Sequence, residues 1–209
     1  MNMKLTPLFA LAGLALASTG IQAESLVEGS AEAGKARALT CTACHGPEGN
    51  SVSPMWPNIA GQNAPYLLAQ LQAFKNGSRS DPLMTGQAMM LSDDDMANLA
   101  VYFESLPAAV QAVADVKLLD RGEPLYRGGN QEDKTSACLA CHGPTGRGNP
   151  AAKYPALQGQ HAAYIAKQLN DYANGVRISD GKTRVMRDIA ARLDKDDIAA
   201  LSSYVQGLK

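Results

Sequence analysis

The chain has 209 residues, of which 45% are hydrophobic and 19% charged, and its formal net charge at pH 7 is −1. This composition is typical of a globular protein with one large or two small domains, and it excludes a low-complexity chain. The sequence contains no block of Lys and Arg, which excludes a basic nucleic-acid-binding surface, so we expect no nucleic acid among its partners.

Residues 1–23 have the pattern of a secretory signal peptide. Lys4 supplies a short positive start, residues 6–17 are apolar, and residues 20–23 form a cleavage-site pattern ending at Ala23. The apolar stretch is too short for a spanning helix with a stop-transfer flank, and an uncleaved anchor is the alternative. We therefore predict a mature chain that begins near Glu24, has no later membrane span and, in a bacterium, resides in the periplasm.

The first helix of the mature chain is expected over residues 31–40, with Ser30 as its N-cap. It leads into Cys41-Thr42-Ala43-Cys44-His45, the C-x-x-C-H pattern by which c-type haem is attached. The two thiols lie one helical turn apart, so both can form thioethers with the vinyl groups of one porphyrin, and the histidine that follows can ligate the iron.

The same pattern returns at residues 138–142, so the two copies use all four cysteines and two of the three histidines. Cys41, Cys44, Cys138 and Cys141 are therefore predicted to attach two haem c groups, with His45 and His142 as axial ligands. Two alternatives remain open: a pair of C-x-x-C disulfides of thioredoxin type, and zinc held by Cys and His.

The rest of each half repeats as well, at an offset that grows from 97 to 102 residues. In the first half we expect a Gly/Pro-rich loop over residues 46–61, a helix over 65–76 closed by Gly77, and a helix that starts with a Ser92–Asp95 capping box. In the second half the loop covers residues 143–159, and the helices cover 161–174 and begin again at Asp194. The predicted division is residues 24–106 for the first domain, 107–119 for a linker and 120–209 for the second domain.

The repeat also suggests the second axial ligand of each iron. Met186 is the one methionine of the second domain, eight residues before Asp194, and Met84 stands eight residues before Ser92. A thioether sulfur is a soft ligand for haem iron, so we predict Met84 and Met186 as ligands, with core packing as the alternative. The other methionines of the first domain (Met55, Met89, Met90 and Met96) have no methionine counterpart, and His161 is expected to be a cap or a surface residue.

Further polar groups are expected around each haem. A ligating imidazole usually donates its other N–H to a carbonyl, and the matched prolines Pro57 and Pro155 each offer one, although they could merely stiffen their loops. Side chains that could bind the haem propionates are Gln62, Gln160, Tyr66, Tyr164, Trp56 and Arg79.

Charge divides unevenly between the two halves. Residues 24–106 contain four Lys and Arg against nine Asp and Glu, a net charge of −5, whereas residues 107–209 contain fourteen against eleven, a net charge of +3. The resulting dipole could orient docking to charged partners, or the two surfaces could simply be solvated.

These features resemble the cytochrome c4 family. The resemblance covers nearly the whole mature chain and includes the paired C-x-x-C-H-G motifs, residues 127–129, 159–164 and 201–208, and Met186-Arg187. It implies an all-α fold of two homologous class I cytochrome c domains in tandem, related by a pseudo-twofold. It also places the axial methionines at Met84 and Met186.

The function implied is electron transfer by a periplasmic protein with two haem c groups. Its expected partners are redox proteins: a membrane or soluble electron donor and a terminal oxidase, with peripheral membrane association allowed. One alternative is an electron-transfer subunit of a dehydrogenase complex. Another is a dihaem peroxidase, which would need an open iron site and usually more histidines than this chain has.

Overall fold

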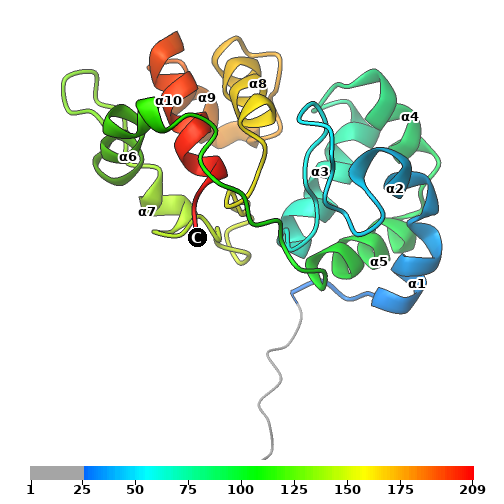
Figure 1. The fold of residues 1–209 in the computed structure, drawn as a ribbon. Helices are drawn as coiled ribbons and strands as arrows, with labels where there is room; N and C mark the ends of the chain where they lie inside the picture. Colours follow the sequence, from blue (N-terminus) through cyan, green and yellow to red (C-terminus); the bar gives the residue numbers. More distant parts are fainter. Residues whose placement is uncertain (1–25) are drawn as a thin grey trace, which may run out of the picture.

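The computed structural model describes residues 26–209, so the predicted signal peptide, residues 1–23, lies outside the described part. Two groups of helices, α1–α5 and α6–α10, form two domains side by side, with an extended segment crossing from one to the other (Figure 1). Within residues 26–209 the β structure amounts to two isolated bridges, which confirms the all-α prediction. No helix in that range is both long and apolar enough to cross a membrane.

The first domain contains α1 (Ala31–Arg37), α2 (Leu39–His45), α3 (Ala64–Asn76), α4 (Pro82–Met89) and α5 (Asp93–Glu104). The predicted caps are present: Ser30 Oγ accepts from Ala33 N–H, and Gly77 ends α3 with φ of 80°. The first helix does not continue to residue 40, because Ala38 N–H turns back to Lys35 O and separates α1 from α2. Helix α4 was not predicted.

The second domain repeats this order. It contains η1 (Val116–Leu118), α6 (Leu119–Gly128), α7 (Leu139–His142), α8 (Ala162–Ala173), η2 (Gly181–Thr183), α9 (Val185–Ala190) and α10 (Lys195–Gln206). Between α6 and α7 it adds a short loop closed by two backbone hydrogen bonds between Asn130 and Thr135. Gly129, with φ of 71°, ends α6 at the start of this insertion.

In each domain the first and last helices cross at a glycine. A Cβ on Gly34 of α1 would collide with the backbone oxygen of Asn98 on α5, and a Cβ on Gly122 of α6 would collide with that of Ala200 on α10. The hydrophobic clusters beside these crossings contain Met96, Leu99 and Phe103 in domain one and Tyr126, Leu201 and Val205 in domain two. The glycines therefore bring the terminal helices close enough to close each core.

The segment between the domains is held against both of them. Ala108 packs on Gly61 and Ala109 on Gly159, and both glycines have φ of 65°, where a side chain would be strained as well as crowded. Gln111 Nε2 donates to Gly159 O at 2.6 Å, and Asp115 N–H donates to Ser203 Oγ at 2.7 Å. The repeated Gly-Gln pair thus marks the place where the linker passes each domain.

Candidate haem sites

Each motif histidine ends a short helix and points its ring into its domain. His45 and His142 are 7% and 6% exposed, and their Nδ1 atoms lie 2.8 Å from Pro57 O and 3.0 Å from Pro155 O. A carbonyl can only accept, so Nδ1 carries the proton and Nε2 is left to bind a metal. The predicted hydrogen bonds to the proline carbonyls are confirmed.

Burial lowers the pKa of both rings, and the hydrogen bonds to Pro57 and Pro155 oppose this only in part. Two neutral imidazoles, each with a fixed tautomer and a free Nε2, match the donor that haem iron requires.

Each of the four cysteines is partly buried and lies at the helix that ends in its motif histidine. Burial raises the pKa of Cys41, and it raises that of Cys138 to about 11, whereas a thioredoxin-type thiol would be acidified. No group of three or more Cys, His, Asp or Glu within residues 26–209 is placed to hold a metal ion, so the zinc alternative has no ligand set there. The arrangement fits thiols that attach a haem.

Met84 and Met186 occupy matching short helices, α4 and α9, and both are partly buried. Asp81 Oδ1 caps α4 by accepting from the N–H groups of Leu83 and Met84 at 3.1 and 3.0 Å. Helix α9 is held differently, since Asp180 accepts from the backbone N–H of Arg187 at 3.0 Å and from its Nε at 2.7 Å. The two candidate ligands thus lie on equivalent helices that are held by different hydrogen bonds.

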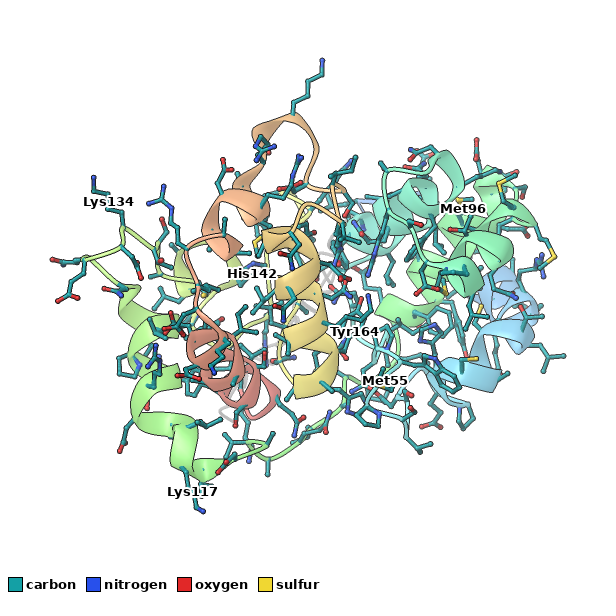
Figure 2. All side chains as sticks on the ribbon, turned by 90° about the horizontal axis from the view of Figure 1, so that it is seen from above. Met55, Met96, Lys117, Lys134, His142 and Tyr164 are labelled. Atoms are coloured by element: carbon teal, nitrogen blue, oxygen red, sulfur yellow. The ribbon has the colours of Figure 1, made fainter. Side chains whose placement is uncertain are left out.

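The other methionines lie where the ligand hypothesis needs them. Met96 is fully buried in the core of domain one, whereas Met55, Met89 and Met90 are exposed. In Figure 2, Met96 lies within domain one, among its helices. These positions agree with packing and surface roles for the four, and the axial role of Met84 and Met186 remains a prediction.

A polar cluster lies between the domains. It consists of two buried arginines, two buried glutamines and two partly buried tyrosines: Arg79, Arg177, Gln70, Gln168, Tyr66 and Tyr164. Arg79 donates to Tyr164 OH at 2.7 Å and to Gln168 Oε1 at 2.8 Å, across the interface. Arg177 makes the reciprocal contacts in the other direction, donating to Tyr66 OH at 2.8 Å and to Gln70 Oε1 at 2.7 Å. Figure 2 shows Tyr164 between the two domains.

The two arginines of this cluster bring positive charge into a buried interface. Within residues 26–209 neither Arg79 nor Arg177 forms an ion pair with a carboxylate. Burial alone would raise the pKa of Tyr66, but the guanidinium groups of Arg177 and Arg79 outweigh burial and lower it. Because a buried charge is normally paired, two arginines without carboxylates fit the propionates that each haem carries.

Sequence reasoning included Arg79 among the propionate candidates but missed Arg177, although the repeat offset of 98 residues that relates Gln62 to Gln160 also relates these two arginines. It also named Gln62 and Gln160, whose amides instead bind the backbone of the opposite domain. The expected surface or cap residue His161 sits at the N-cap of α8, and its Nε2 lies 2.9 Å from Ser51 O of domain one.

The chain is similar to known proteins over most of its length. The family model described as "Cytochrome c" matches it twice, at residues 31–107 and 126–209. It is 48% identical to cytochrome c4 of Azotobacter vinelandii, with 92% of this chain and 96% of that protein covered. It is 34% identical to a thiosulfate dehydrogenase electron acceptor of Stutzerimonas stutzeri, with 80% and 78% covered. The crystal structure of reduced recombinant cytochrome c4 from Pseudomonas stutzeri superposes with a TM-score of 0.85 at 47% identity, covering 87% of this chain and all of that one.

Proposed function

Because the chain belongs to the cytochrome c4 family, electron carriers with two covalently bound haem c groups, we propose that it carries electrons between respiratory partners in the periplasm, toward a terminal oxidase. Export follows from the signal-peptide pattern of residues 1–23. The observation that carries the proposal is the twofold repetition of one ligand arrangement: a buried histidine with its Nδ1 proton on a proline carbonyl, and a methionine on the matching short helix.

Haem c supplies one-electron chemistry, its iron alternating between the ferrous and ferric states. In this proposal each domain's own residues do three things. The cysteines of the motif would attach the porphyrin, the motif histidine and the methionine would bind the iron, and the buried arginines would pair with the propionates. The residues assigned to the two irons are His45, Met84, His142 and Met186. These side chains would fill both axial positions and leave no iron site for a substrate, as a carrier requires.

The polar interface supports electron transfer between the two haems. The arginine and tyrosine side chains of each domain reach into the other, so the cluster fixes the relative placement of the two pockets. Fixed donor and acceptor dipoles need no rearrangement when charge moves past them. An electron that enters at one domain can thus leave from the other.

A spectroscopic experiment tests this assignment. We expect the oxidised holoprotein to contain two low-spin irons and a sulfur-to-iron charge-transfer band. This band should lose half its intensity in Met84→Ala, half in Met186→Ala, and all of it in the double variant. Met89→Ala is the matched control, since Met89 is exposed on the same helix as Met84, and it should leave the band unchanged. A high-spin iron in the wild-type protein that responds to peroxide would contradict the carrier.

The relative named as a thiosulfate dehydrogenase electron acceptor supports a second candidate, an electron-transfer subunit bound to a dehydrogenase. That similarity is lower in identity and in coverage than the similarity to cytochrome c4. Gel filtration of native extract separates the two candidates. A free carrier elutes at the size of the chain alone, and a subunit elutes in a larger complex with dehydrogenase activity.

A further inference from the structure

One peptide group links His45 to the opposite domain. The carbonyl of Pro57 accepts the Nδ1 proton of His45 at 2.8 Å. The N–H of the same peptide group, which belongs to Asn58, donates to Gln160 Oε1 of domain two at 2.9 Å. The imidazole of domain one and the amide of domain two therefore bind the two ends of a single peptide dipole.

Domain two has the reciprocal arrangement. The carbonyl of Pro155 accepts from His142 Nδ1 at 3.0 Å, and the N–H of Ala156 in that peptide group donates to Gln62 Oε1 of domain one at 2.8 Å. Gln62 and Gln160 are matched residues of the repeat, and each is 7% exposed. The pseudo-twofold thus exchanges the two connections.

The orientation of both glutamine amides is fixed by their partners. Gln62 Oε1 also accepts from Asn63 N–H at 3.0 Å, and its Nε2 donates to Ala156 O at 2.8 Å. Gln160 Oε1 accepts from His161 N–H at 3.0 Å, and its Nε2 donates to Asn58 O at 2.8 Å. In each glutamine amide, one atom lies next to two N–H donors and must be the oxygen, and the other lies next to a carbonyl and must be the nitrogen. The amide oxygen therefore faces the peptide N–H of the group whose carbonyl holds the histidine.

Hydrogen bonds in a chain polarise one another, so an acceptor on the peptide N–H makes the carbonyl at its other end a stronger acceptor. A stronger acceptor on Nδ1–H raises the basicity of the imidazole and favours the ferric state of the iron it binds. We propose that Gln62 tunes the haem of domain two through His142, and that Gln160 tunes the haem of domain one through His45. This proposal rests on the proposed axial role of the two histidines.

The two connections differ in their support. In domain one the Asn58 side chain also crosses the interface, since its Nδ2 donates to Gly159 O at 2.8 Å while its Oδ1 accepts from Ser51 N–H at 2.8 Å. In domain two the matching residue is Ala156, which has no polar side chain, so the peptide relies more on its glutamine. The substitution of Gln62 should therefore have the larger effect.

The test uses the holoprotein with Gln62→Leu, which removes the acceptor from the Ala156 N–H. The reduction potential of each haem is followed by NMR during a redox titration, with haem methyl signals assigned through contacts with that domain's cysteine side chains. We expect the reduction equilibrium of the domain-two haem to shift about three- to tenfold toward the ferrous state, a tenfold shift being about 59 mV for one electron. The domain-one haem should stay unchanged, and Gln160→Leu should give the reverse pattern, with a smaller shift.

Asn63→Ala is the matched control. Asn63 also crosses the interface, donating from Nδ2 to Tyr154 O at 2.9 Å and to Arg147 O at 3.3 Å, but its side chain does not bind the peptide that holds a motif histidine. It should loosen the interface without moving either potential. If Asn63→Ala reproduces the shift, or if Gln62→Leu moves the haem of its own domain as much as the other, the glutamines are only interface anchors and the proposal is overturned.

A second variant keeps the test decisive if Gln62→Leu folds poorly. Gln62→Glu retains an acceptor for the Ala156 N–H and strengthens it by charge. In the diamagnetic ferrous protein, the Nδ1 proton of His142 should move downfield in Gln62→Glu and upfield in Gln62→Leu. Shifts of the same sign in both variants would overturn the proposal. The low-spin spectrum of the wild-type protein separates this outcome from failure of the carrier assignment, because only the latter alters that spectrum.

Discussion

The two domains share an interior and differ in their outer surfaces. Both close their cores where a glycine lets the first helix touch the last, both bind the motif histidine to a proline carbonyl, and both send an arginine across the interface. These shared features lie at the haem pockets and the interface, where the same large rigid group must be accommodated twice.

The outer surfaces around the two methionine helices differ in charge. Helix α4 and its C-cap expose Leu83, Met89 and Met90, and they are followed by the exposed acidic residues Asp93 and Asp94. The matching region of domain two exposes both signs of charge, with four basic residues (Lys182, Arg184, Arg192 and Lys195) and three acidic ones (Asp188, Asp194 and Asp196). The net charges of −5 for residues 24–106 and +3 for residues 107–209 follow the same division. Similar pockets behind dissimilar surfaces allow two partners to be told apart.

The largest expected effect tests the shared interior. Gly34→Ala and Gly122→Ala each place a methyl group against the backbone of the crossing helix, so each should destabilise its domain by about 3 kcal/mol. Thermal unfolding of the holoprotein measures this. Gly86→Ala and Gly128→Ala are matched controls, since a Cβ at either position meets nothing within 4 Å. Their thermal unfolding midpoints should not fall. Equal losses of stability at all four glycines would contradict the requirement for glycine where the first and last helices cross.

Substitution of the interface arginines should give the next largest loss of stability. Arg79→Met removes the hydrogen bonds to Tyr164 and Gln168 and leaves a tyrosine hydroxyl unpaired, at an expected cost of about 2 kcal/mol. The pseudo-twofold predicts a similar cost for Arg177→Met. Calorimetry should show unfolding of the two domains becoming less coupled in both variants.

Arg37→Met is the control for this pair. Arg37 has two polar contacts, with Met90 O at 3.3 Å and Asp95 at 3.5 Å, and unlike those of Arg79 and Arg177 both lie on the surface of domain one. Arg37→Met should lower the free energy of unfolding by less than about 1 kcal/mol. The unfolding of the two domains should remain coupled. A markedly larger effect at Arg79 than at Arg177 would mean that the interface is not symmetric.

The caps of the last helices give a smaller effect that differs in kind between the domains. Ser92 caps α5 with a hydroxyl, so Ser92→Ala should cost about 1 kcal/mol. Asp194 caps α10 with a carboxylate, whose pKa is lowered mainly by hydrogen bonds from backbone N–H groups and also by Arg121. A lowered pKa means that this stabilisation is complete above the ordinary carboxyl pKa and is lost as pH falls below about 4.

Unfolding measured against pH checks the comparison. Asp194→Asn should be less stable than wild type at neutral pH, and the difference should shrink as the pH falls through the lowered pKa of Asp194. The Ser92→Ala difference should change less over that range, because the serine hydroxyl itself does not titrate there and affects only the carboxyl of Asp95. A constant Asp194→Asn difference down to acidic pH would refute the role of the charge.

The sequence was sufficient for the features encoded locally. Capping residues such as Ser92 and Asp95 and the glycine after α3 each act within a few residues, so the start of α5 and the end of α3 could be predicted. The matched prolines of the repeat were sufficient to predict the histidine–proline hydrogen bonds. The repeat supplied the all-α division into two similar halves, because matched residues occupy matched places.

Contacts between the domains could not be predicted in the same way. The amide of Gln62 is polar and could serve a propionate equally well; only the docked arrangement shows it bound to Ala156. Helix α4 begins with proline and contains a glycine and a threonine, which is a weak helix pattern, and the Asp81 cap compensates for it. Arg177 was missed because a single arginine has no periodicity, although its match with Arg79 was a usable signal.

The smallest expected effect tests the difference between the surfaces. Asp94→Lys in domain one and Lys182→Glu in domain two each reverse one exposed charge. Two one-electron oxidants of opposite charge serve as probes of the reduced protein: cationic tris(phenanthroline)cobalt(III) and anionic hexacyanoferrate(III). At low ionic strength, Asp94→Lys should slow the cationic oxidant about threefold and leave the anionic one nearly unchanged, and Lys182→Glu should do the reverse. Both effects should fade as added salt shortens the screening length. If instead each variant slows one oxidant and speeds the other to a similar extent, only the total charge of the protein matters. The two surfaces then do not select different partners.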